Sequence, residues 1–130
     1  MQAFDLDDTL ARVDWQQAGV RGLARIFAQA KVLYRPTGPF IVITARAHGT
    51  AAARNATLMW LRDNFDNFVS IYYCQGESEA EIVKDKARLI KAHSVTSFTD
   101  NNPQILTELK KLTTGITLYR AYADGTRKQF

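Results

Sequence analysis

The sequence lacks most of the features that would place the chain outside the class of ordinary globular domains. It has one cysteine, Cys74, so no intrachain disulfide can form and a disulfide-stabilised scaffold is excluded. No apolar run approaches the roughly 18–20 residues of a membrane-spanning helix, and we see no internal repeat, low-complexity tract or Gly/Ser linker. The beginning, with acidic residues soon after Met1, is unlike a signal or transit peptide, so the expected location is a reducing cytoplasm.

The composition is that of one globular domain, which we expect to span residues 1–130. Hydrophobic residues make up 46% of the chain and charged residues 23%, a balance that argues against disorder. Seventeen Lys and Arg residues outnumber thirteen Asp and Glu residues, which gives a formal charge of +4. This moderate excess is compatible with an anionic substrate or a nucleic acid, but it requires neither.

Short apolar runs alternate with longer amphipathic segments along the chain. The runs typical of buried strands are residues 3–6, 40–43, 69–73, 95–99 and 116–119. The helical segments are residues 16–30 and 50–64, a capped segment from Ser78 to about Ala92, and a segment from Asn102-Pro103 to just before Gly115. The alternation predicts an α/β fold with a three-layer, Rossmann-like, doubly wound parallel sheet of about five strands.

Polar clusters follow three of the expected strands, where function lies in sheets of this kind. They are Asp5-Leu6-Asp7-Asp8-Thr9, Thr44-Ala45-Arg46 and Asp100-Asn101-Asn102. Because two of the clusters are acidic, they predict a hard-oxygen site for Mg²⁺. The alternative for the first cluster is a turn held by Asx-type hydrogen bonds.

The same strand ends resemble the motifs of a known family. The matching segments are Asp5-Leu6-Asp7-Asp8-Thr9-Leu10, Ile43-Thr44-Ala45-Arg46 and Phe98-Thr99-Asp100-Asn101-Asn102-Pro103. Together with a lysine in the third helix, they are similar to the four motifs of the haloacid dehalogenase-like (HAD) phosphatases. The motifs occur in the family's order, and the resemblance covers nearly the whole chain.

The resemblance implies a Mg²⁺-dependent phosphomonoester hydrolase that works through an aspartyl-phosphate intermediate. Asp5 would be the nucleophile, and Asp7 would be the general acid and base. Thr44 and the lysine would bind the phosphoryl group. Asp5, Asp100 and the main-chain carbonyl of Asp7 would hold the metal, with Asn101 as a further contact where some members of the family carry an acid.

The third helix offers two lysines for this role, Lys84 and Lys86. At 100° per residue, Lys86 falls on the apolar face of the helix, whereas Lys84 falls on the other side. A lysine on a buried face needs a charged partner, and the acidic clusters supply one. We therefore expect Lys86 to be the catalytic and phosphate-binding lysine, with Lys84 as the alternative.

The spacing of the motifs leaves no room for a cap domain, so a capless enzyme is expected, alone or as an oligomer that supplies a lid. Residues 54–62 are weakly similar to the helix after the second motif of phage polynucleotide kinase 3′-phosphatase domains. With Arg46 expected to bind substrate, this favours a nucleotide or a nucleic-acid phosphate end. The alternatives are a sugar or small-metabolite phosphatase and a non-catalytic nucleic-acid-binding or regulatory module.

Four further side chains have two interpretations each. Trp15 and Tyr34, in predicted loops, either stack on a base or pack against the domain. His48 either contacts substrate or is an exposed loop residue, which we favour. Cys74, at the end of the third expected strand, is interpreted as a buried thiol without a catalytic role, since no histidine is placed to activate it.

Overall fold

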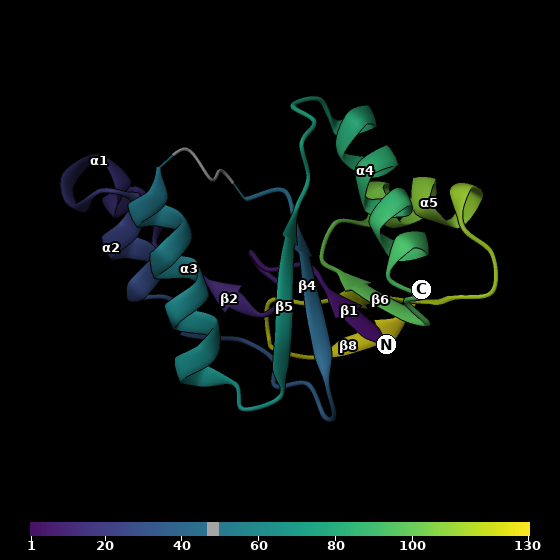
Figure 1. Ribbon diagram of the computed structural model, residues 1–130, viewed down its shortest axis with the longest axis horizontal. Helices are drawn as coiled ribbons and strands as arrows, with labels where there is room; N and C mark the ends of the chain where they lie inside the picture. Colours follow the sequence, from purple (N-terminus) through teal and green to yellow (C-terminus); the bar gives the residue numbers. More distant parts are fainter. Residues whose placement is uncertain (47–49) are drawn as a thin grey trace.

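The computed structural model describes residues 1–46 and 50–130, so the interpretation of His48 falls outside the described residues. The fold is α/β, with a six-stranded, mostly parallel central sheet and a separate two-stranded ladder (Figure 1). The strands are β1 (Gln2–Phe4), β2 (Ala11–Arg12), β3 (Lys31–Val32), β4 (Phe40–Thr44), β5 (Phe68–Tyr73), β6 (Ser97–Asp100), β7 (Thr117–Ala121) and β8 (Arg127–Gln129). The helices are the 3₁₀ helix η1 (Trp15–Gln17), α1 (Ala18–Arg21), α2 (Leu23–Ala28), α3 (Ala51–Asn64), α4 (Glu79–Ala92) and α5 (Pro103–Leu112).

The strand order of the main sheet is β5-β4-β1-β6-β7-β8. β1 pairs in parallel with both β4 and β6, and β6 pairs in parallel with β7. The chain builds one side of the sheet through β4 and β5 and then returns to build the other side, so the strand order reverses between β1 and β6. Ligands bind at such a point, beyond the carboxyl ends of the strands.

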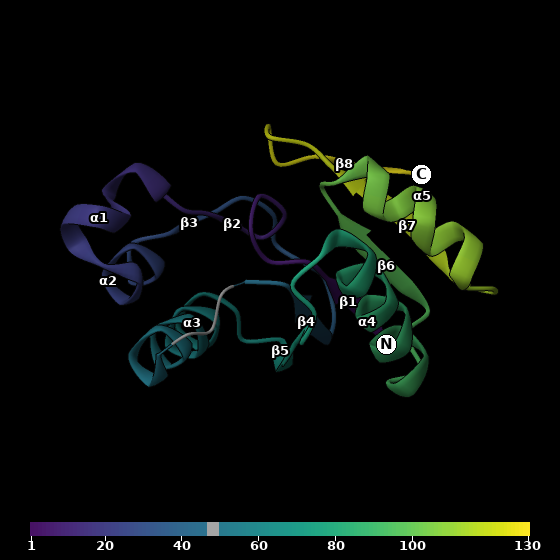
Figure 2. The ribbon, with the colours of Figure 1, turned by 90° about the horizontal axis from the view of Figure 1, so that it is seen from above.

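Helices cover both faces of the sheet, which makes three layers (Figure 2). Alternate side chains of the strands face opposite layers, as the two-residue period of a strand requires. Ala3, Ile41 and Ile43 pack on the side of α4 and α5. Phe4 and Val42 pack with residues of α3. None of the described helices has the length and apolar character that a bilayer crossing needs.

The strand count is a correction to the expected fold. All five expected strands exist, but β8 adds a sixth that pairs antiparallel with β7. Its residues, Arg127-Lys128-Gln129, are polar and form the edge of the sheet, so no apolar pattern indicates a strand there. The short β2–β3 ladder was not expected either, because each of its strands has two residues.

The single helix expected over residues 16–30 is also wrong. It is divided at Gly22, whose φ of 81° lies in the left-handed region where a residue with a side chain is strained. The break ends α1 before α2 begins, and Val20 of α1 is 83% exposed. Only Ile26 and Phe27 of α2 are buried.

The two helices on the other face begin where the sequence predicts. Ser78 Oγ accepts a hydrogen bond from Glu81 N, and Glu81 Oε1 accepts one from Ser78 N, so the capping box is confirmed. Asn102 Oδ1 accepts from the amides of the first turn of α5, behind Pro103 at the first helical position. These caps satisfy amides of the first turn and so fix the residue at which each helix begins.

Candidate active site

Three strand ends meet beside the point where the strand order reverses. Asp5 follows β1, Thr44 ends β4, and Asp100 ends β6. The backbone bond from Asp5 N to Thr99 O, 2.8 Å long, ties the first of these ends to the third. The three ends line an open pocket of about 380 Å³. The pocket brings together all seven predicted site residues: Asp5, Asp7, Thr44, Arg46, Lys86, Asp100 and Asn101.

One side of the pocket is a buried group that we call the lysine cluster: Asp5, Lys86 and Asp100. Lys86 Nζ donates to Asp5 Oδ1 at 3.2 Å and to Asp100 Oδ2 at 2.7 Å. Lys86 shares the buried face of α4 with Val83, whereas Lys84 is exposed. The structure therefore places Lys86, and not Lys84, against the carboxylates.

Burial and charge act together on the protonation of the lysine cluster. Burial and the neighbouring Asp100 carboxylate raise the pKa of Asp5 to about 7, although Lys86 opposes the shift. Burial alone would lower the pKa of the Lys86 ammonium, but the two carboxylates outweigh it and raise that pKa above its usual range. Lys86 therefore stays charged at neutral pH, while Asp5 is harder to ionise than an ordinary aspartate.

The lysine cluster also offers oxygens to a cation. The tip of the Asn101 amide lies 3.2 Å from Asp5 Oδ2, from the main-chain oxygen of Asp7 and from Asp100 Oδ1. With its NH₂ group there, the two hydrogens of the amide are shared among these three oxygens. With its oxygen there, four oxygens converge, an arrangement that is stable only around a cation.

The donor set suits one class of metal ion. Over residues 1–46 and 50–130 there is no group of three or more His, Cys, Asp or Glu side chains placed to hold a metal. Two carboxylates, a main-chain carbonyl and an amide oxygen are nevertheless the hard ligands that Mg²⁺ takes together with water. The residues present fit Mg²⁺ and offer no soft ligand for a transition metal.

The opposite side of the pocket is a second group, the arginine cluster: Asp7, Arg46, Thr57 and Phe27. Arg46 Nε lies 3.1 Å and 3.0 Å from the two carboxylate oxygens of Asp7, and Nη2 also contacts Oδ1. Arg46 Nη1 donates to Thr57 Oγ1 at 3.1 Å. The guanidinium also lies 3.9 Å from the ring centroid of Phe27, a cation–π contact. Arg46 is thus held on three sides.

Arg46 does not lie where a residue that only binds substrate would be expected. Arg46 lines the pocket, but its guanidinium is buried and directed at Asp7, whose side chain remains 23% exposed. Sequence reasoning missed the partners Thr57 and Phe27. One signal was available for Thr57, because it shares the buried face of α3 with Ala53 and Trp60, where a hydroxyl needs a partner.

Thr44 completes the pocket between the two clusters. Its Oγ1 accepts from Arg46 N at 2.9 Å, which shapes the turn after β4. In the part of the chain that the structure describes, the hydroxyl proton of Thr44 has no acceptor. Thr44 is 1% exposed and lines the pocket, so its hydroxyl is placed to donate to an anionic oxygen bound there.

The remaining candidates have different outcomes. Trp15 lines the pocket, is 43% exposed and packs edge-on against Phe27. Tyr34 packs against Phe4, with Arg127 5.2 Å from its ring centroid, so its packing interpretation is confirmed. Cys74 is buried, as expected, and burial raises the pKa of its thiol to about 11, which disfavours a nucleophilic thiolate.

Comparisons of the chain with protein-family models, with curated proteins and with solved structures find no match. What the chain does must therefore be argued from its own residues and their geometry.

Proposed function

We propose that the protein is a Mg²⁺-dependent phosphomonoester hydrolase of the capless HAD type, with an aspartyl-phosphate formed on Asp5. The observation that carries the proposal is the lysine cluster: a buried ammonium bridging two carboxylates at the point where the strand order reverses. Asp7 and Thr44 on the same pocket supply the other two groups that the reaction needs.

The first half of the reaction transfers the phosphoryl group to Asp5. A carboxylate oxygen of Asp5 attacks phosphorus, and the new P–O bond forms as the bond to the leaving oxygen breaks. Asp7 gives its proton to that oxygen, so the leaving group departs as a neutral alcohol. In the second half a water attacks the phosphorus, Asp7 takes the proton of that water, and the Asp5 carboxylate is regenerated with release of phosphate.

The other pocket residues bind and orient the phosphoryl group. Thr44 donates its hydroxyl proton to one phosphoryl oxygen, and Lys86 balances the negative charge that grows in the transition state. Lys86 starts against Asp5 and Asp100, so it is placed before substrate arrives and needs little rearrangement. Such preorganisation is the main source of stabilisation in sites of this kind.

The oxygens of Asp5, Asp100, Asn101 and the Asp7 carbonyl would hold Mg²⁺. When bound, the ion neutralises the repulsion between an anionic phosphate and the Asp5 carboxylate. The same neutralisation would bring the pKa of Asp5 down from its raised value, so that the carboxylate is ionised when substrate binds.

The open pocket supports the capless assignment. The described chain between β1 and β4 contains β2, η1, α1, α2 and β3, and the described chain between β4 and α4 contains α3 and β5. These elements pack on the sheet and its neighbours and leave the pocket reachable from solvent. An open site accepts phosphates on large molecules, which is why a nucleotide or a nucleic-acid end is proposed as substrate.

The decisive experiment is phosphate release from p-nitrophenyl phosphate with and without Mg²⁺. We expect Mg²⁺-dependent turnover by the unmodified protein and none by Asp5→Asn, whose amide is a poor nucleophile. Asp66→Asn makes the same change at an exposed carboxylate outside the pocket and should keep full activity. Beryllium fluoride with Mg²⁺ should form an adduct on Asp5. Turnover by Asp5→Asn, or an adduct on Asp7 instead, would contradict the proposal.

A further inference from the structure

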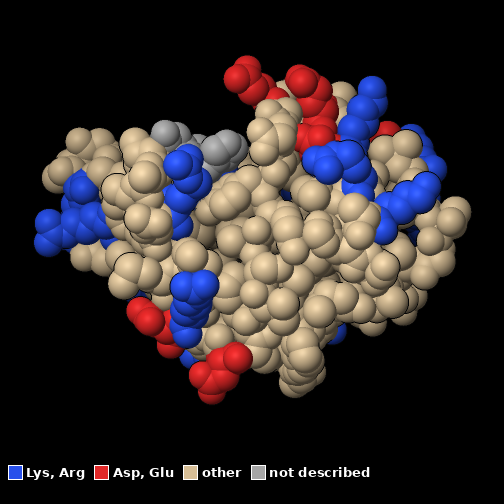
Figure 3. Space-filling model, in the orientation of Figure 1, with Lys and Arg blue, Asp and Glu red and all other residues tan. Residues whose placement is uncertain are grey.

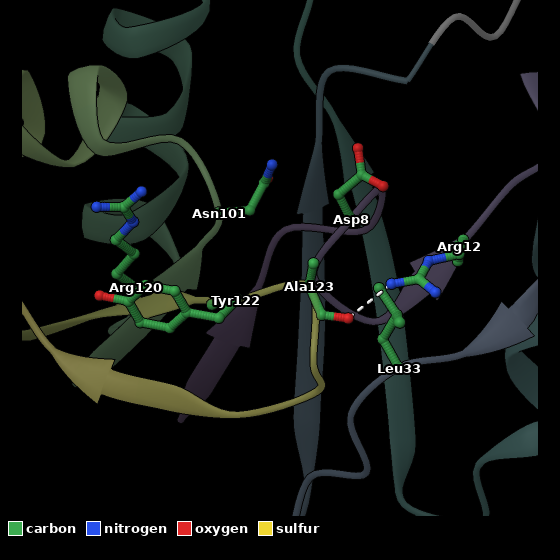
Figure 4. A pocket seen from close by; sticks show the side chains of 8 residues that line it. Asp8, Arg12, Leu33, Asn101, Arg120, Tyr122 and Ala123 are labelled. Atoms are coloured by element: carbon green, nitrogen blue, oxygen red, sulfur yellow. Dashed lines mark hydrogen bonds between the residues drawn. The ribbon is translucent and has the colours of Figure 1, made fainter.

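A second hollow adjoins the candidate active site, and the proposed reaction does not use it. It has a volume of about 290 Å³ and shares Asp8 and Asn101 with the first pocket. Arg12 of β2 and Leu33 form one wall, and the segment from Arg120 to Ala123, at the end of β7, forms the other (Figure 4). We call this hollow the outer cleft. A group bound there would lie next to a phosphate bound at Asp5.

The two arginines of the outer cleft have no carboxylate partner among the described residues. Arg12 Nη2 donates to the Ala123 carbonyl at 2.6 Å, as drawn in Figure 4. The Arg120 guanidinium lies 5.0 Å from the ring centroid of Tyr122, and its buried Nε has no acceptor in the described chain. A buried N–H without an acceptor is unfavourable, and a bound ligand that supplied one would relieve it.

The charge of the outer cleft favours an anion. Its lining holds two arginines and one carboxylate, Asp8. In Figure 4 the Asp8 carboxylate points away from Arg120, and Arg12 lies on its other side. Guanidinium groups bind phosphate through paired N–H donors, which makes arginine the side chain most suited to a phosphate oxygen.

The turn that carries one wall is fixed in place. Tyr122 N donates to Thr126 O at 2.9 Å, and Gly125 N donates to Tyr122 O at 3.0 Å. Gly125 has a φ of 84°, and a Cβ at this position would lie 2.6 Å from the Leu33 carbonyl oxygen. The turn therefore sits directly on the opposite wall, and the outer cleft is preformed and does not depend on a ligand to close it.

The two basic side chains that line the candidate active site itself, Lys86 and Arg46, already contact carboxylates. Arg46, the basic residue expected to meet the substrate, is occupied by Asp7 and Thr57. On the face shown in Figure 3, Lys and Arg side chains are spread over both ends of the molecule and do not form one continuous patch.

We infer that the outer cleft binds a second phosphate group carried by the leaving alcohol of the substrate, through Arg12 and Arg120. The inference rests on the proposed function and narrows the range of its substrates. The preferred substrates are then phosphomonoesters with a neighbouring phosphate, such as nucleoside 3′,5′-bisphosphates and phosphorylated ends of nucleic acids. Sugar monophosphates and single nucleoside monophosphates lack the group that the outer cleft binds.

The test compares substrates that differ by one phosphate. We expect kcat/KM of the unmodified protein for a nucleoside 3′,5′-bisphosphate to exceed that for either monophosphate by about 10- to 100-fold, the range of a charged hydrogen-bond pair. Arg120→Gln and Arg12→Gln should each remove most of this preference and flatten its dependence on salt. Both variants should hydrolyse p-nitrophenyl phosphate within about twofold of the unmodified protein.

Controls separate binding from folding. Arg62→Gln removes an exposed arginine of α3 and should leave the preference unchanged. Arg120→Lys keeps the charge without the paired donors, so it should retain an intermediate preference. Equal kcat/KM for bisphosphate and monophosphates, or variants that lose p-nitrophenyl phosphate turnover to the same degree, would overturn the inference.

The same variants separate failure of the inference from failure of the proposed function. If the unmodified protein does not hydrolyse p-nitrophenyl phosphate with Mg²⁺, the proposed function is wrong. Calorimetric titration with the bisphosphate then tests the outer cleft alone. Binding that Arg120→Gln weakens about tenfold would support the cleft as a phosphate site, and the absence of binding would overturn it.

Discussion

The two clusters that flank the candidate active site pair charges in different ways. In the lysine cluster one ammonium bridges two carboxylates, and Lys86 and Asp100 are 2% and 1% exposed. In the arginine cluster one guanidinium forms an ion pair with a single carboxylate, and the Asp7 side chain remains 23% exposed. In the first arrangement the ammonium and Asp100 are closed off from solvent, and only the Asp5 side chain keeps 11% exposure at the pocket; the second is open on the side of its carboxylate.

The difference follows from what each cluster would do in the proposed reaction. A buried ammonium between two carboxylates holds the three charges in fixed positions. The attraction between them is stronger because the surroundings have a low dielectric constant. A proton-transferring carboxylate must reach both the substrate and water, so it cannot be sealed. A planar arginine stacked on Phe27 can still fix the orientation of such a carboxylate from one side, which a flexible lysine would not do.

The strongest test of this comparison is Lys86→Met. The substitution leaves two buried carboxylates without a counter-charge, and removal of one partner from a buried pair costs about 3–5 kcal/mol of unfolding free energy. Denaturant unfolding at pH 7 with EDTA measures the loss. Lys84→Met, on the exposed side of α4, should change the stability by less than about 0.5 kcal/mol. A loss below about 1 kcal/mol for Lys86→Met would contradict a sealed lysine cluster.

A second test uses the raised pKa of Asp5. Because that pKa is about 7 in the folded protein and 3.8 ordinarily, the folded state binds a proton that the unfolded state has lost between about pH 4 and pH 7. The resulting stability is complete below about pH 4 and is lost as the pH rises through 7. The Asp5→Asn variant has no ionisable group at this position, so it does not lose stability in this way.

We therefore expect the stability advantage of Asp5→Asn over the unmodified protein to grow from pH 4 to pH 8 in EDTA. The increase should reach at most about 4 kcal/mol, the equivalent of three pKa units. Thermal and urea unfolding across this pH range measure it. Asp66→Asn, at an exposed carboxylate, should show no such trend. A difference that stays flat with pH would mean that Asp5 is not desolvated.

The lysine cluster could be predicted from sequence because the residues next to each of its members in the chain indicate where that member lies. Asp5 and Asp100 follow apolar runs, and parallel strands bring such ends to one edge of the sheet. Lys86 breaks an otherwise apolar helix face, which indicates a buried partner of opposite charge. No side-chain rotamer had to be known for this inference.

The arginine cluster could not be predicted in the same way. Arg46 stands in a loop after a strand, and its long side chain reaches either a substrate or a neighbouring residue. Which of these it does depends on Phe27 and Thr57, which belong to other elements. The break at Gly22 and the polar strand β8 were missed for other reasons. The left-handed conformation of Gly22 leaves no mark on the apolar pattern, and β8 forms by pairing with β7 although its own residues are polar.

Arg46→Lys tests whether the arginine cluster positions Asp7 or binds substrate. Lysine keeps the charge but loses the paired contact with the carboxylate. We expect kcat/KM for an alkyl phosphate, whose leaving group needs a proton, to fall about 10- to 100-fold, within the range of a lost general acid. With p-nitrophenyl phosphate, whose leaving group needs no proton, the fall should be less than about threefold.

The matched control is Arg62→Lys on the exposed side of α3, which should affect neither substrate. Equal losses with both phosphates would mean that Arg46 binds the phosphoryl group directly, as its place after Thr44 first indicated. That result would remove the functional contrast between the two clusters while leaving the lysine cluster unchanged.

The smallest effect is expected from Thr57→Val, which removes one buried contact of the arginine cluster. Arg46 Nη1 loses its acceptor, and an unsatisfied buried donor costs about 1–2 kcal/mol of unfolding free energy. The contacts of Arg46 with Asp7 and Phe27 remain, so the ratio of alkyl to p-nitrophenyl phosphate turnover should change less than about threefold. Thr57→Ser keeps the hydroxyl and should leave that ratio unchanged. A shift as large as that of Arg46→Lys would show that Thr57, rather than the carboxylate contact, holds Arg46 in place.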